Sequence, residues 1–593
     1  MKPDLSNQRK ITVDKSYFLK NSDKNSKEQM KKTLLVLVLT LSFAVSGLAQ
    51  MPSKASSNST KAAGGITQAQ LKKYLYYIAS DELEGRNTPS KGLDMAAKFI
   101  ADNLKSWGVK PAGDNGTYFQ TMKMRRDAID TAAAAMEIGG KKFAYAEDFF
   151  RMAGTTNGVL SKPLVFVGNG WMVKSKNIDA YSGVDVAGKI VVVQLIGMPR
   201  NESLRVLPQG VTQADLKQEA RGTEWADPVF YARQKGAAGI IFVASPEVQD
   251  FWARLKEGMS EGPGMQIEGL HTEGGAAGNR QQNQLPVLLV SRTVGSALFG
   301  GETANPIENP QAMTAFAFGD NKNISINAAT KAETATTQNV VGMIEGSDPT
   351  LKAEMVAIGA HYDHDGIGKS VPPKCKNGPR DDVLYNGADD DGSGTVAVLS
   401  IAEALAKSGK KPKRSILFVW HAGEEKGLLG SAYFTKFPTV DLSKVVTQLN
   451  IDMIGRSKAA GDTKPENKDL SGPNEIYVIG SKMMSTELGN VSEAVNGSFL
   501  NLSYNYKYDD PNDTNRFFFR SDHFNYAQKG IPIIFWFDGV HEDYHCPSDH
   551  PDKIDYAKME KVTRTIFATM WEIADAGKRP TVDKKLPAQL TGQ

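Results

Sequence analysis

The sequence predicts an α/β protein with a mostly parallel sheet covered by helices on both faces, together with an inserted, β-rich α/β unit. In the C-terminal half, short β-branched runs alternate with helical patterns, an order that is typical of parallel sheets. A central section has β-branched runs of its own but no cluster of histidines or acidic residues. The length of 593 residues exceeds one ordinary hydrophobic core and favours two or more domains.

Helices are expected first along the chain. Leu71, Leu75 and Ile78 recur at the spacing of one helix face, and a second helical pattern runs through residues 95–107 and is stopped by Gly108. The polar segment 81–86 between them is expected to form a turn. Ahead of both, residues 51–65 are rich in Ser, Ala, Lys, Asn and Gly, a composition that predicts a flexible linker.

Strands are expected in the central section and again in the C-terminal half. The central strands are predicted at 164–167, 190–193 and 240–243. The C-terminal half is predicted to contain a helix at 395–406 and strands at 355–358, 416–420, 445–451 and 533–537. Because ligands of such sheets bind beyond the carboxyl ends of the strands, a functional site is expected at that edge.

The N-terminal residues are typical of an export signal. Lys31-Lys32 precede an apolar run at 34–45, and Gly47 and Ala49 supply the small residues of a cleavage site near Ala49. Either Met1 or Met30 can be the start, and the run is too short for a comfortable membrane span. We therefore expect a periplasmic or extracellular protein without stable membrane insertion after signal removal, with an uncleaved anchor as the alternative.

These patterns divide the chain into six segments. They are an N-terminal extension with the signal peptide, a linker, the first part of a main domain, an inserted domain, the rest of the main domain and a tail, at 1–49, 50–65, 66–155, 156–300, 301–580 and 581–593. The net charge of +3 is small for this length, and no basic stripe is interleaved with aromatic residues, so no nucleic-acid partner is expected. The oligomeric state is not predicted.

The chain has two cysteines, Cys375 and Cys546, and both flank the suspected metal site that is described below. In an exported protein they could form one disulfide. Metal contact and free thiols are the alternatives, because the sequence does not show that the two residues meet.

Acidic and imidazole side chains gather at the predicted strand ends. The clearest case is the segment 387–394, Gly-Ala-Asp-Asp-Asp-Gly-Ser-Gly, with His361-Tyr362-Asp363 before it and Glu424-Glu425 after it. Seven of the eight histidines lie between His361 and His550, which assigns the chemistry to the C-terminal half. Carboxylate oxygens and imidazole nitrogens are the ligands that a pair of divalent metals needs, so the pattern indicates metal-assisted hydrolysis.

A two-metal hydrolase needs a bridging carboxylate, terminal ligands for each metal and a base for the reacting water. Asp390 is the candidate bridge, and Glu424, which is adjacent to a candidate ligand, is the candidate base. The terminal ligands are expected in two pairs, His361 with Asp452 and Glu425 with His545. Gly387, Gly392 and Gly394 would let the backbone aim Asp390 inward.

These motifs make the C-terminal half similar to the zinc exopeptidases that include bacterial leucyl aminopeptidases and glutamate carboxypeptidases, whose fold is phosphorylase/hydrolase-like. The motifs are His361-Tyr362-Asp363, Gly387-Ala388-Asp389-Asp390, Glu424-Glu425-Lys426-Gly427, Asn450-Ile451-Asp452-Met453 and Tyr544-His545. The resemblance implies two zinc ions per chain, with ligands at His361, Asp390, Glu425, Asp452 and His545 and with Glu424 as general base. It also implies that Asp363 orients His361 and that Tyr544 helps to hold the substrate carbonyl or the oxyanion, with a wall residue as the alternative for Tyr544.

The section at about 160–295 resembles, more loosely, a protease-associated domain, through Val186-Ala187-Gly188-Lys189-Ile190 and Gly236-Ala237-Ala238-Gly239-Ile240. Other polar residues near the motifs are expected to have supporting roles. Asp389 and Asp391 are expected to be neighbours of the bridge rather than ligands. Arg520 is expected to make an ordinary ion pair, with contact to the substrate as the alternative. The remaining histidines of this half are expected to be structural, to support ligands or to lie on the surface: His364, His421, His523, His541 and His550.

The resemblance implies an exported zinc metallopeptidase, and an aminopeptidase that acts on peptide substrates fits best. Abundant carboxylates suit a free amine, whereas a carboxypeptidase needs Arg or Lys for a carboxylate. A carboxypeptidase or dipeptidase on the same fold is the alternative within hydrolases. A non-catalytic binding protein on a degenerate peptidase fold, or a single-zinc cyclase, is a weaker alternative.

Overall fold

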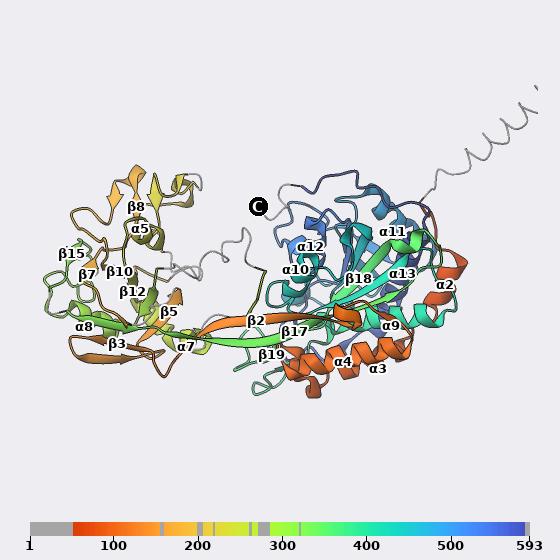
Figure 1. Ribbon diagram of the computed structural model, residues 1–593, viewed down its shortest axis with the longest axis horizontal. Helices are drawn as coiled ribbons and strands as arrows, with labels where there is room; N and C mark the ends of the chain where they lie inside the picture. The colour runs from red at the N-terminus through yellow and green to blue at the C-terminus, as the bar shows by residue number, and fades with distance from the viewer. Residues whose placement is uncertain are drawn as a thin grey trace, which may run out of the picture.

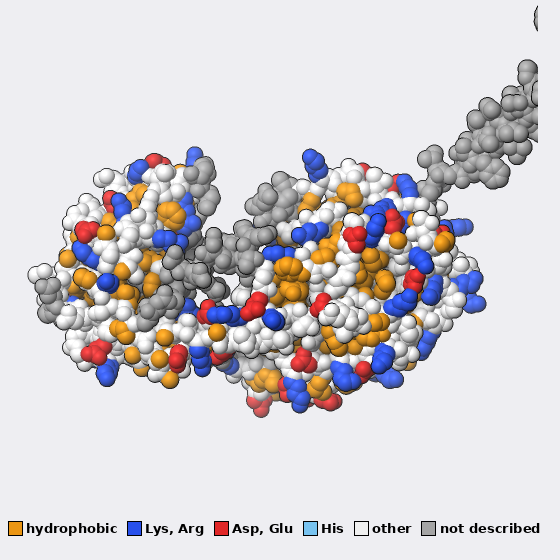
Figure 2. Space-filling view, viewed as in Figure 1, with side chains coloured by type: hydrophobic (Ala, Val, Ile, Leu, Met, Phe, Trp, Pro, Cys, Tyr) orange, Lys and Arg blue, Asp and Glu red, His pale blue; other side chains and the backbone are white. Residues whose placement is uncertain are grey.

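The computed structural model describes residues 51–153, 159–198, 206–217, 220–259, 264–270, 285–319 and 322–587. The predicted signal peptide and His271 lie outside these ranges. Two lobes are joined by a long two-stranded arm (Figure 1). Charged side chains of both signs are interspersed over both lobes on the face shown in Figure 2. Within the described ranges, no helix combines the length and the apolar character that a membrane crossing needs.

The larger lobe is built around a ten-stranded sheet with a parallel centre. The strand order is β13-β2-β17-β21-β18-β22-β25-β23-β24, with β1 (Lys110–Pro111) also paired to β17. The last two strands of this order are β23 (Glu475–Ile479) and β24 (Ser503–Asn505). The four parallel neighbours at the centre are β21 (Ser415–His421), β18 (Met355–His361), β22 (Val445–Ile451) and β25 (Ile533–Phe537). All their residues are buried. Strands buried on both faces form continuous apolar runs, which is why the sequence located all four.

Helices cover both faces of this sheet. One core joins α3 (Gln68–Ile78), α4 (Lys91–Ser106), α9 (Gly394–Lys407), α11 (Thr486–Ser498) and α13 (Tyr556–Asp575) to residues such as Val356 and Ile358 of β18. On the other face, Met355 and Ala357 of β18 pack with residues of α10 (Leu429–Lys436) and α12 (His523–Gln528). The alternation follows from the two-residue period of a strand. The expected fold class is confirmed.

Residues 51–65 differ from the expected flexible linker. They include helix α2 (Ser57–Ala63), whose residues Ser59 and Ala63 are buried. Ser59 Oγ donates a hydrogen bond to Glu572 of α13 at 2.5 Å. Ser and Ala suggested flexibility, but their short side chains also let a helix pack closely against another, and here the packing decides the conformation.

The arm consists of β2 (Phe119–Ile129) and β17 (Thr330–Ile344). Residues 340–344 of β17 pair with β21, and residues 330–340 pair with β2. Val340 lies opposite Trp420, next to the last residue of β21. Because β17 is antiparallel to β21, the arm leaves the sheet at the edge where the parallel strands end, and the smaller lobe stands on that side of the larger lobe (Figure 1).

The smaller lobe has its own core around a six-stranded sheet of order β15-β7-β10-β12-β14-β5. Its parallel centre is β7 (Leu164–Phe166), β10 (Ile190–Gln194), β12 (Gly239–Val243) and β14 (Val287–Val290). β5 (Phe149–Ala153) and β15 (Phe316–Ala317) form its edges, and helices α5 (Pro228–Gln234), α6 (Pro246–Asp250) and α8 (Arg292–Phe299) accompany the strands. The predicted central strands are all present.

One segment of the chain returns from the smaller lobe to the larger one. β13 (Gln266–Ile267) pairs with β2 and buries Ile267 in the core of the larger lobe. Lys436 Nζ, at the end of α10, donates a hydrogen bond to Gly269 O at 2.9 Å. The lobes are therefore joined by this contact as well as by the arm.

Candidate metal centre

The strand ends of the larger lobe bring the predicted site residues together. β18 ends at His361, and β22 leads directly into Asp452. The acidic segment 387–394 turns into α9 beside them. Gly387 has a φ of 56°, and a Cβ there would clash with the backbone of Asp390, so only glycine fits this position.

Asp390 lies between two groups of side chains and presents one carboxylate oxygen to each. Its Oδ1 is 3.3 Å from Nε2 of His361, which in turn is 3.7 Å from Oδ1 of Asp452. Its Oδ2 is 3.1 Å from Nε2 of His545, which is 3.2 Å from Oε2 of Glu425. The structure therefore brings the four residues of the two predicted pairs around the shared carboxylate of Asp390.

Three groups of described residues could each hold a metal ion with one ligand atom per residue. They are Asp390–Glu425–His545, His361–Asp391–Asp452 and His364–Asp365–Glu425. Asp391 is already engaged, because its Oδ1 accepts hydrogen bonds from the amides of Gly394 and Met453 at 2.8 and 3.1 Å. Asp389 likewise accepts from the amide of Gly455 at 2.7 Å and lies 3.2 Å from His541. The Oδ2 atoms of both residues have no hydrogen-bond partner among the described residues, so the expectation that they are neighbours of the bridge rather than ligands stays a prediction.

The electrostatics of the cluster favour bound cations. Burial opposes charge on His361, but Asp452 and Glu424 raise its pKa well above the usual value. Burial also opposes charge on His545, but Asp365 and Asp390 raise its pKa to about 11. Burial and the neighbouring carboxylate of Asp390 raise the pKa of Glu425. Crowded buried carboxylates are costly unless positive charge offsets them.

Glu424 lies at the edge of this cluster. Its Oε2 is 4.0 Å from Nε2 of His361, and its side chain is 11% exposed. Burial, with Glu425 and Asp452 adding to it and His361 opposing it, raises the pKa of Glu424 well above the usual value. The amide of Glu424 donates to Oδ1 of Asp363 at 3.1 Å, and Asp363 in turn lies beside Nδ1 of His361. One buried carboxylate thus contacts both the candidate base and a candidate ligand.

Some supporting residues were missed or left undefined by the sequence reasoning. His364 Nδ1 lies 2.8 Å from Oε1 of Glu425, and Asp365 lies 3.2 Å from Nδ1 of His545. Their signal was the continuation of the His361 motif, in which imidazole and carboxylate residues follow one another.

Arg86 had no such signal, because it belongs to the segment expected to be a polar turn. It is fully buried, and its guanidinium donates to the backbone oxygens of Tyr362, Asn386 and Gly387 at 2.7–2.9 Å. It therefore ties the His361 segment to the acidic segment.

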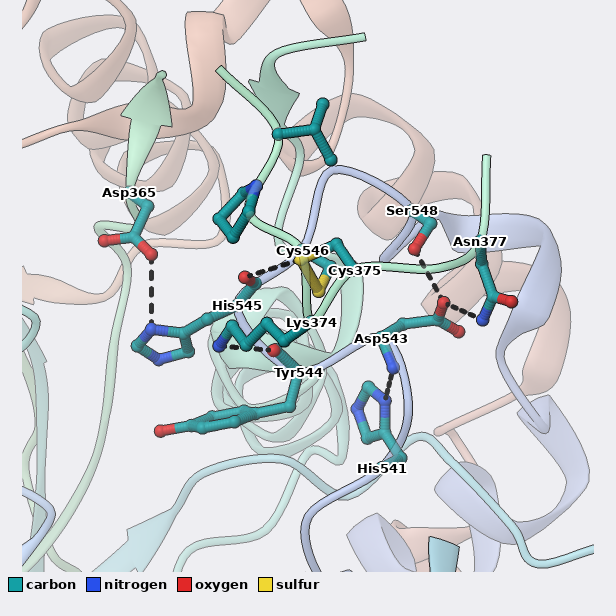
Figure 3. The surroundings of a disulfide bond; sticks show 12 residues. Asp365, Lys374, Cys375, Asn377, His541, Asp543, Tyr544, His545, Cys546 and Ser548 are labelled. Carbon is teal, nitrogen blue, oxygen red and sulfur yellow. Dashed lines mark hydrogen bonds and ion pairs between the residues drawn. A yellow bond between two sulfur atoms is a disulfide. The ribbon is translucent and has the colours of Figure 1, made fainter. Parts of the chain in front are cut away.

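Cys375 and Cys546 form a disulfide, which settles the alternatives left open by the sequence. Cys546 follows His545 directly, so the cross-link joins loop 368–386 to the segment that carries a candidate ligand (Figure 3). Lys374 Nζ donates to Tyr544 O at 3.3 Å on the same side of the link. The loop is thereby fixed next to His545.

The other histidines of this half contact residues outside the two histidine–carboxylate groups. His421 contacts Asp522 and Tyr526 at 3.4 and 3.0 Å, and His550 lies 3.8 Å from Asp382. His523 is buried against the ring of Phe535, and burial lowers its pKa to about 3, so it is neutral. The expectation for Arg520 was wrong, because no described acidic side chain lies within 4 Å of it; its Nη2 donates to the hydroxyl of Tyr544 at 3.0 Å instead.

A pocket opens onto the cluster. Its charged wall consists of Asp390, Glu424, Asp452 and His545, and Tyr544 and Arg520 form one side. The remaining wall is apolar and consists of Met453, Phe517, Phe535, Phe537 and Val540. A polar cluster that faces an apolar pocket is the arrangement of a small-molecule or peptide site.

A mostly parallel α/β sheet with a buried cluster of carboxylates and imidazoles at its carboxyl edge is the arrangement of a metal-dependent hydrolase. Residues 339–570, which contain all the candidate metal-site motifs, match the model of peptidase family M28. This segment of the chain is therefore similar to peptidase family M28, in agreement with the resemblance inferred from the motifs.

Parts of the chain are also similar to individual proteins. The "Probable leucine aminopeptidase" of Trichophyton verrucosum (strain HKI 0517) is 28% identical over 264 residues, 40% of this chain and 64% of that protein. The "probable leucine aminopeptidase 2" of Aspergillus oryzae (strain ATCC 42149 / RIB 40) is 32% identical over 149 residues, 25% of this chain and 26% of that protein. The chain thus spans less than two thirds of these relatives. A solved structure, "Aminopeptidase from Aneurinibacillus sp. strain AM-1", aligns with 88% of this chain and 98% of its own at 17% identity and a TM-score of 0.46.

Proposed function

We propose that this chain is an exported zinc metallopeptidase that removes N-terminal residues from peptides. One observation carries the proposal: Asp390 offers one oxygen to each of two histidine–carboxylate groups. The match of this segment to a peptidase family and the names of the relatives support it. Export rests on the N-terminal sequence and agrees with the disulfide.

The donor set fits two zinc ions. Imidazole nitrogen and carboxylate oxygen are ordinary zinc ligands, and no hydrogen bond from the described residues satisfies the buried Oδ2 of Asp390. His361, Asp390 and Asp452 would hold one ion, and Asp390, Glu425 and His545 the other. Bound there, zinc would supply Lewis acidity that polarises the scissile carbonyl and acidifies the attacking water.

The protein's own groups would handle the proton and the developing charge. Glu424 lies beside the cluster and would accept a proton from the attacking water at Oε2 and return it to the leaving amine. Burial raises the pKa of Tyr544 well above the usual value, so its hydroxyl stays protonated. Since Arg520 donates to the hydroxyl oxygen, the hydroxyl proton is left to donate to the substrate oxyanion.

The test is hydrolysis of leucyl peptides with and without zinc. Dialysis against a chelator should abolish hydrolysis, and added zinc should restore it with about two equivalents bound per chain. N-acetylated versions of the same peptides should be left intact, because an aminopeptidase needs the free amine. Less than one equivalent of zinc, with no activity after zinc addition, would favour a non-catalytic binding protein instead.

A carboxypeptidase or dipeptidase is the second candidate, and one observation favours it: a cation, Arg520, lines the pocket. Cleavage of N-acetylated peptides at their C-terminal bond would identify a carboxypeptidase. Cleavage confined to unblocked dipeptides would identify a dipeptidase.

We also propose that the smaller lobe is a protease-associated domain that restricts substrate size. The arm supports this role, because it leaves the sheet at the edge that carries the metal cluster.

A further inference from the structure

One cation in the pocket has no acidic partner among the described residues. Of the described residues that line the pocket, Arg520 is the one with a permanent positive charge. Its guanidinium is exposed, makes no ion pair with a described acidic side chain, and donates a single hydrogen bond, to Tyr544. A guanidinium has five N–H donors, so most of them stay available.

Arg520 is nevertheless held in place. Its guanidinium carbon lies 4.9 Å from the centre of the Phe517 ring, a cation–π distance, and Phe517 is itself buried in the pocket wall. Tyr544, its hydrogen-bond partner, packs its ring 4.1 Å from the ring of His545. Arg520 is thus fixed to the pocket wall and separated from the metal cluster by one side chain.

We infer that Arg520 is a specificity residue that binds a carboxylate of the substrate next to the cleaved bond. The inference rests on the proposed peptidase function and names a substrate class for it: short peptides with an anionic group beside the scissile bond. A planar guanidinium with free donors matches a carboxylate, which can accept two of its N–H groups at once. The ring of Phe517, over which the guanidinium lies, also lines the pocket.

The carboxylate can come from two sources. It is either the main-chain carboxylate of a dipeptide or the side chain of an acidic residue on one side of the bond. Three matched peptide pairs separate these sources: Leu-Leu against Leu-Leu-amide, Leu-Glu-amide against Leu-Gln-amide, and Glu-Leu-amide against Gln-Leu-amide. Each pair differs only in whether one carboxylate is present.

The experiment measures kcat/KM for the three pairs with the zinc-loaded full chain and with Arg520→Gln. Gln keeps a donor for Tyr544 and removes the charge. The matched control is Arg516→Gln, which removes an exposed arginine stacked 4.4 Å from the Phe519 ring but outside the pocket lining. We expect the wild type to prefer the carboxylate member of one pair by about 10- to 100-fold, the range of one charge-assisted interaction. Arg520→Gln should reduce that preference to near unity, mainly through KM, and Arg516→Gln should retain it.

Other outcomes overturn the inference. If Arg520→Gln slows all six peptides equally and leaves every ratio unchanged, Arg520 only positions Tyr544. If the wild type shows no carboxylate preference yet cleaves the neutral amides, the inference fails and the peptidase function stands. If no peptide is cleaved by the zinc-loaded protein, the proposed function fails and the inference fails with it.

Discussion

The two lobes share one architectural principle and differ at the ends of their strands. In both, parallel strands are buried along their whole length. In the larger lobe β18 ends at His361 and β22 is followed by Asp452, whereas in the smaller lobe β12 and β14 are followed by short segments that contain Ser245 and Ser291. Each of these serines accepts a hydrogen bond from the backbone of the helix that it caps. The residues that follow the parallel strands therefore form a candidate reactive site in the larger lobe, whereas in the smaller lobe they cap helices.

The residues after the strands also differ between the two lobes in the free-energy cost of burying them. A capping serine satisfies a free amide within its own segment and needs no partner. The carboxylates and imidazoles of the larger lobe are crowded and buried, and they are costly without a cation. A parallel sheet thus permits a site at its carboxyl edge, but the residues after the strands decide whether one exists.

The most direct test of this difference between the lobes is to neutralise one acidic residue that follows a strand in each lobe. Glu424→Gln should reduce kcat by about 10²- to 10⁴-fold, the usual contribution of an acid–base group, because the amide cannot take the proton. Its zinc content should be unchanged. Glu247→Gln, at the matching place after β12, is the control and should leave kcat unchanged. Full activity of Glu424→Gln would contradict the assignment of the base.

The buried parallel strands and the residues that follow them could be predicted from the sequence, because burial on both faces requires a continuous apolar run. The fully buried strands form apolar runs, so β18, β21, β22 and β25 were located closely, and the acidic and imidazole residues after them were brought into one cluster as expected.

Long-range contacts set the limits of sequence reasoning. Arg86 sits in a polar turn, and three of the four backbone oxygens that its guanidinium contacts lie about 280–300 residues away in the sequence. The arm was also missed, because β2 has a burial pattern of mostly alternating and partly exposed residues. The helix at 57–63 depends on its contact with α13, a distant partner that local composition does not encode.

The disulfide belongs to the larger lobe alone, since the chain has two cysteines and both lie there. Cys375→Ala with Cys546→Ala should lower the free energy of unfolding of that lobe by about 3–5 kcal/mol, because the link closes a long loop of the unfolded chain. Zinc affinity should also fall, since loop 368–386 would no longer be tied to the segment of His545. Denaturant unfolding and zinc titration measure the two effects.

The smaller lobe provides the internal control for this change. Its unfolding, followed by hydrogen exchange in β10, β12 and β14, should be the same with and without the cross-link. Equal loss of protection in both lobes would show that they unfold as one unit.

The stability of the larger lobe should also depend on pH through a carboxylate that lies outside the metal cluster. Burial raises the pKa of Asp509 to about 6, although it accepts a hydrogen bond from the amide of Gly480. Since the folded-state pKa lies above the unfolded value, the stabilisation is complete below about pH 4 and is lost as pH rises through 6. Asp509→Asn should therefore raise the stability at pH 8 by about 1–3 kcal/mol and change it little at pH 4. Thermal unfolding at both pH values tests this, with the exposed neighbour Asp510→Asn as the control.

Removal of the smaller lobe tests whether it acts on the site at all. Ile129 of β2 lies opposite Thr330 of β17, so residues 130–329 can be replaced by Asn-Gly, which forms a two-residue hairpin turn between paired strands. The loss of β13 and of the contact between Lys436 and Gly269 should lower the stability of the remaining lobe slightly. If the smaller lobe restricts access, leucine amide should be cleaved with unchanged kcat/KM, while peptides of about ten residues should be cleaved a few-fold faster. An unchanged ratio between short and long peptides would assign the lobe no part in substrate selection, and its sheet would then be a structural insertion on the arm.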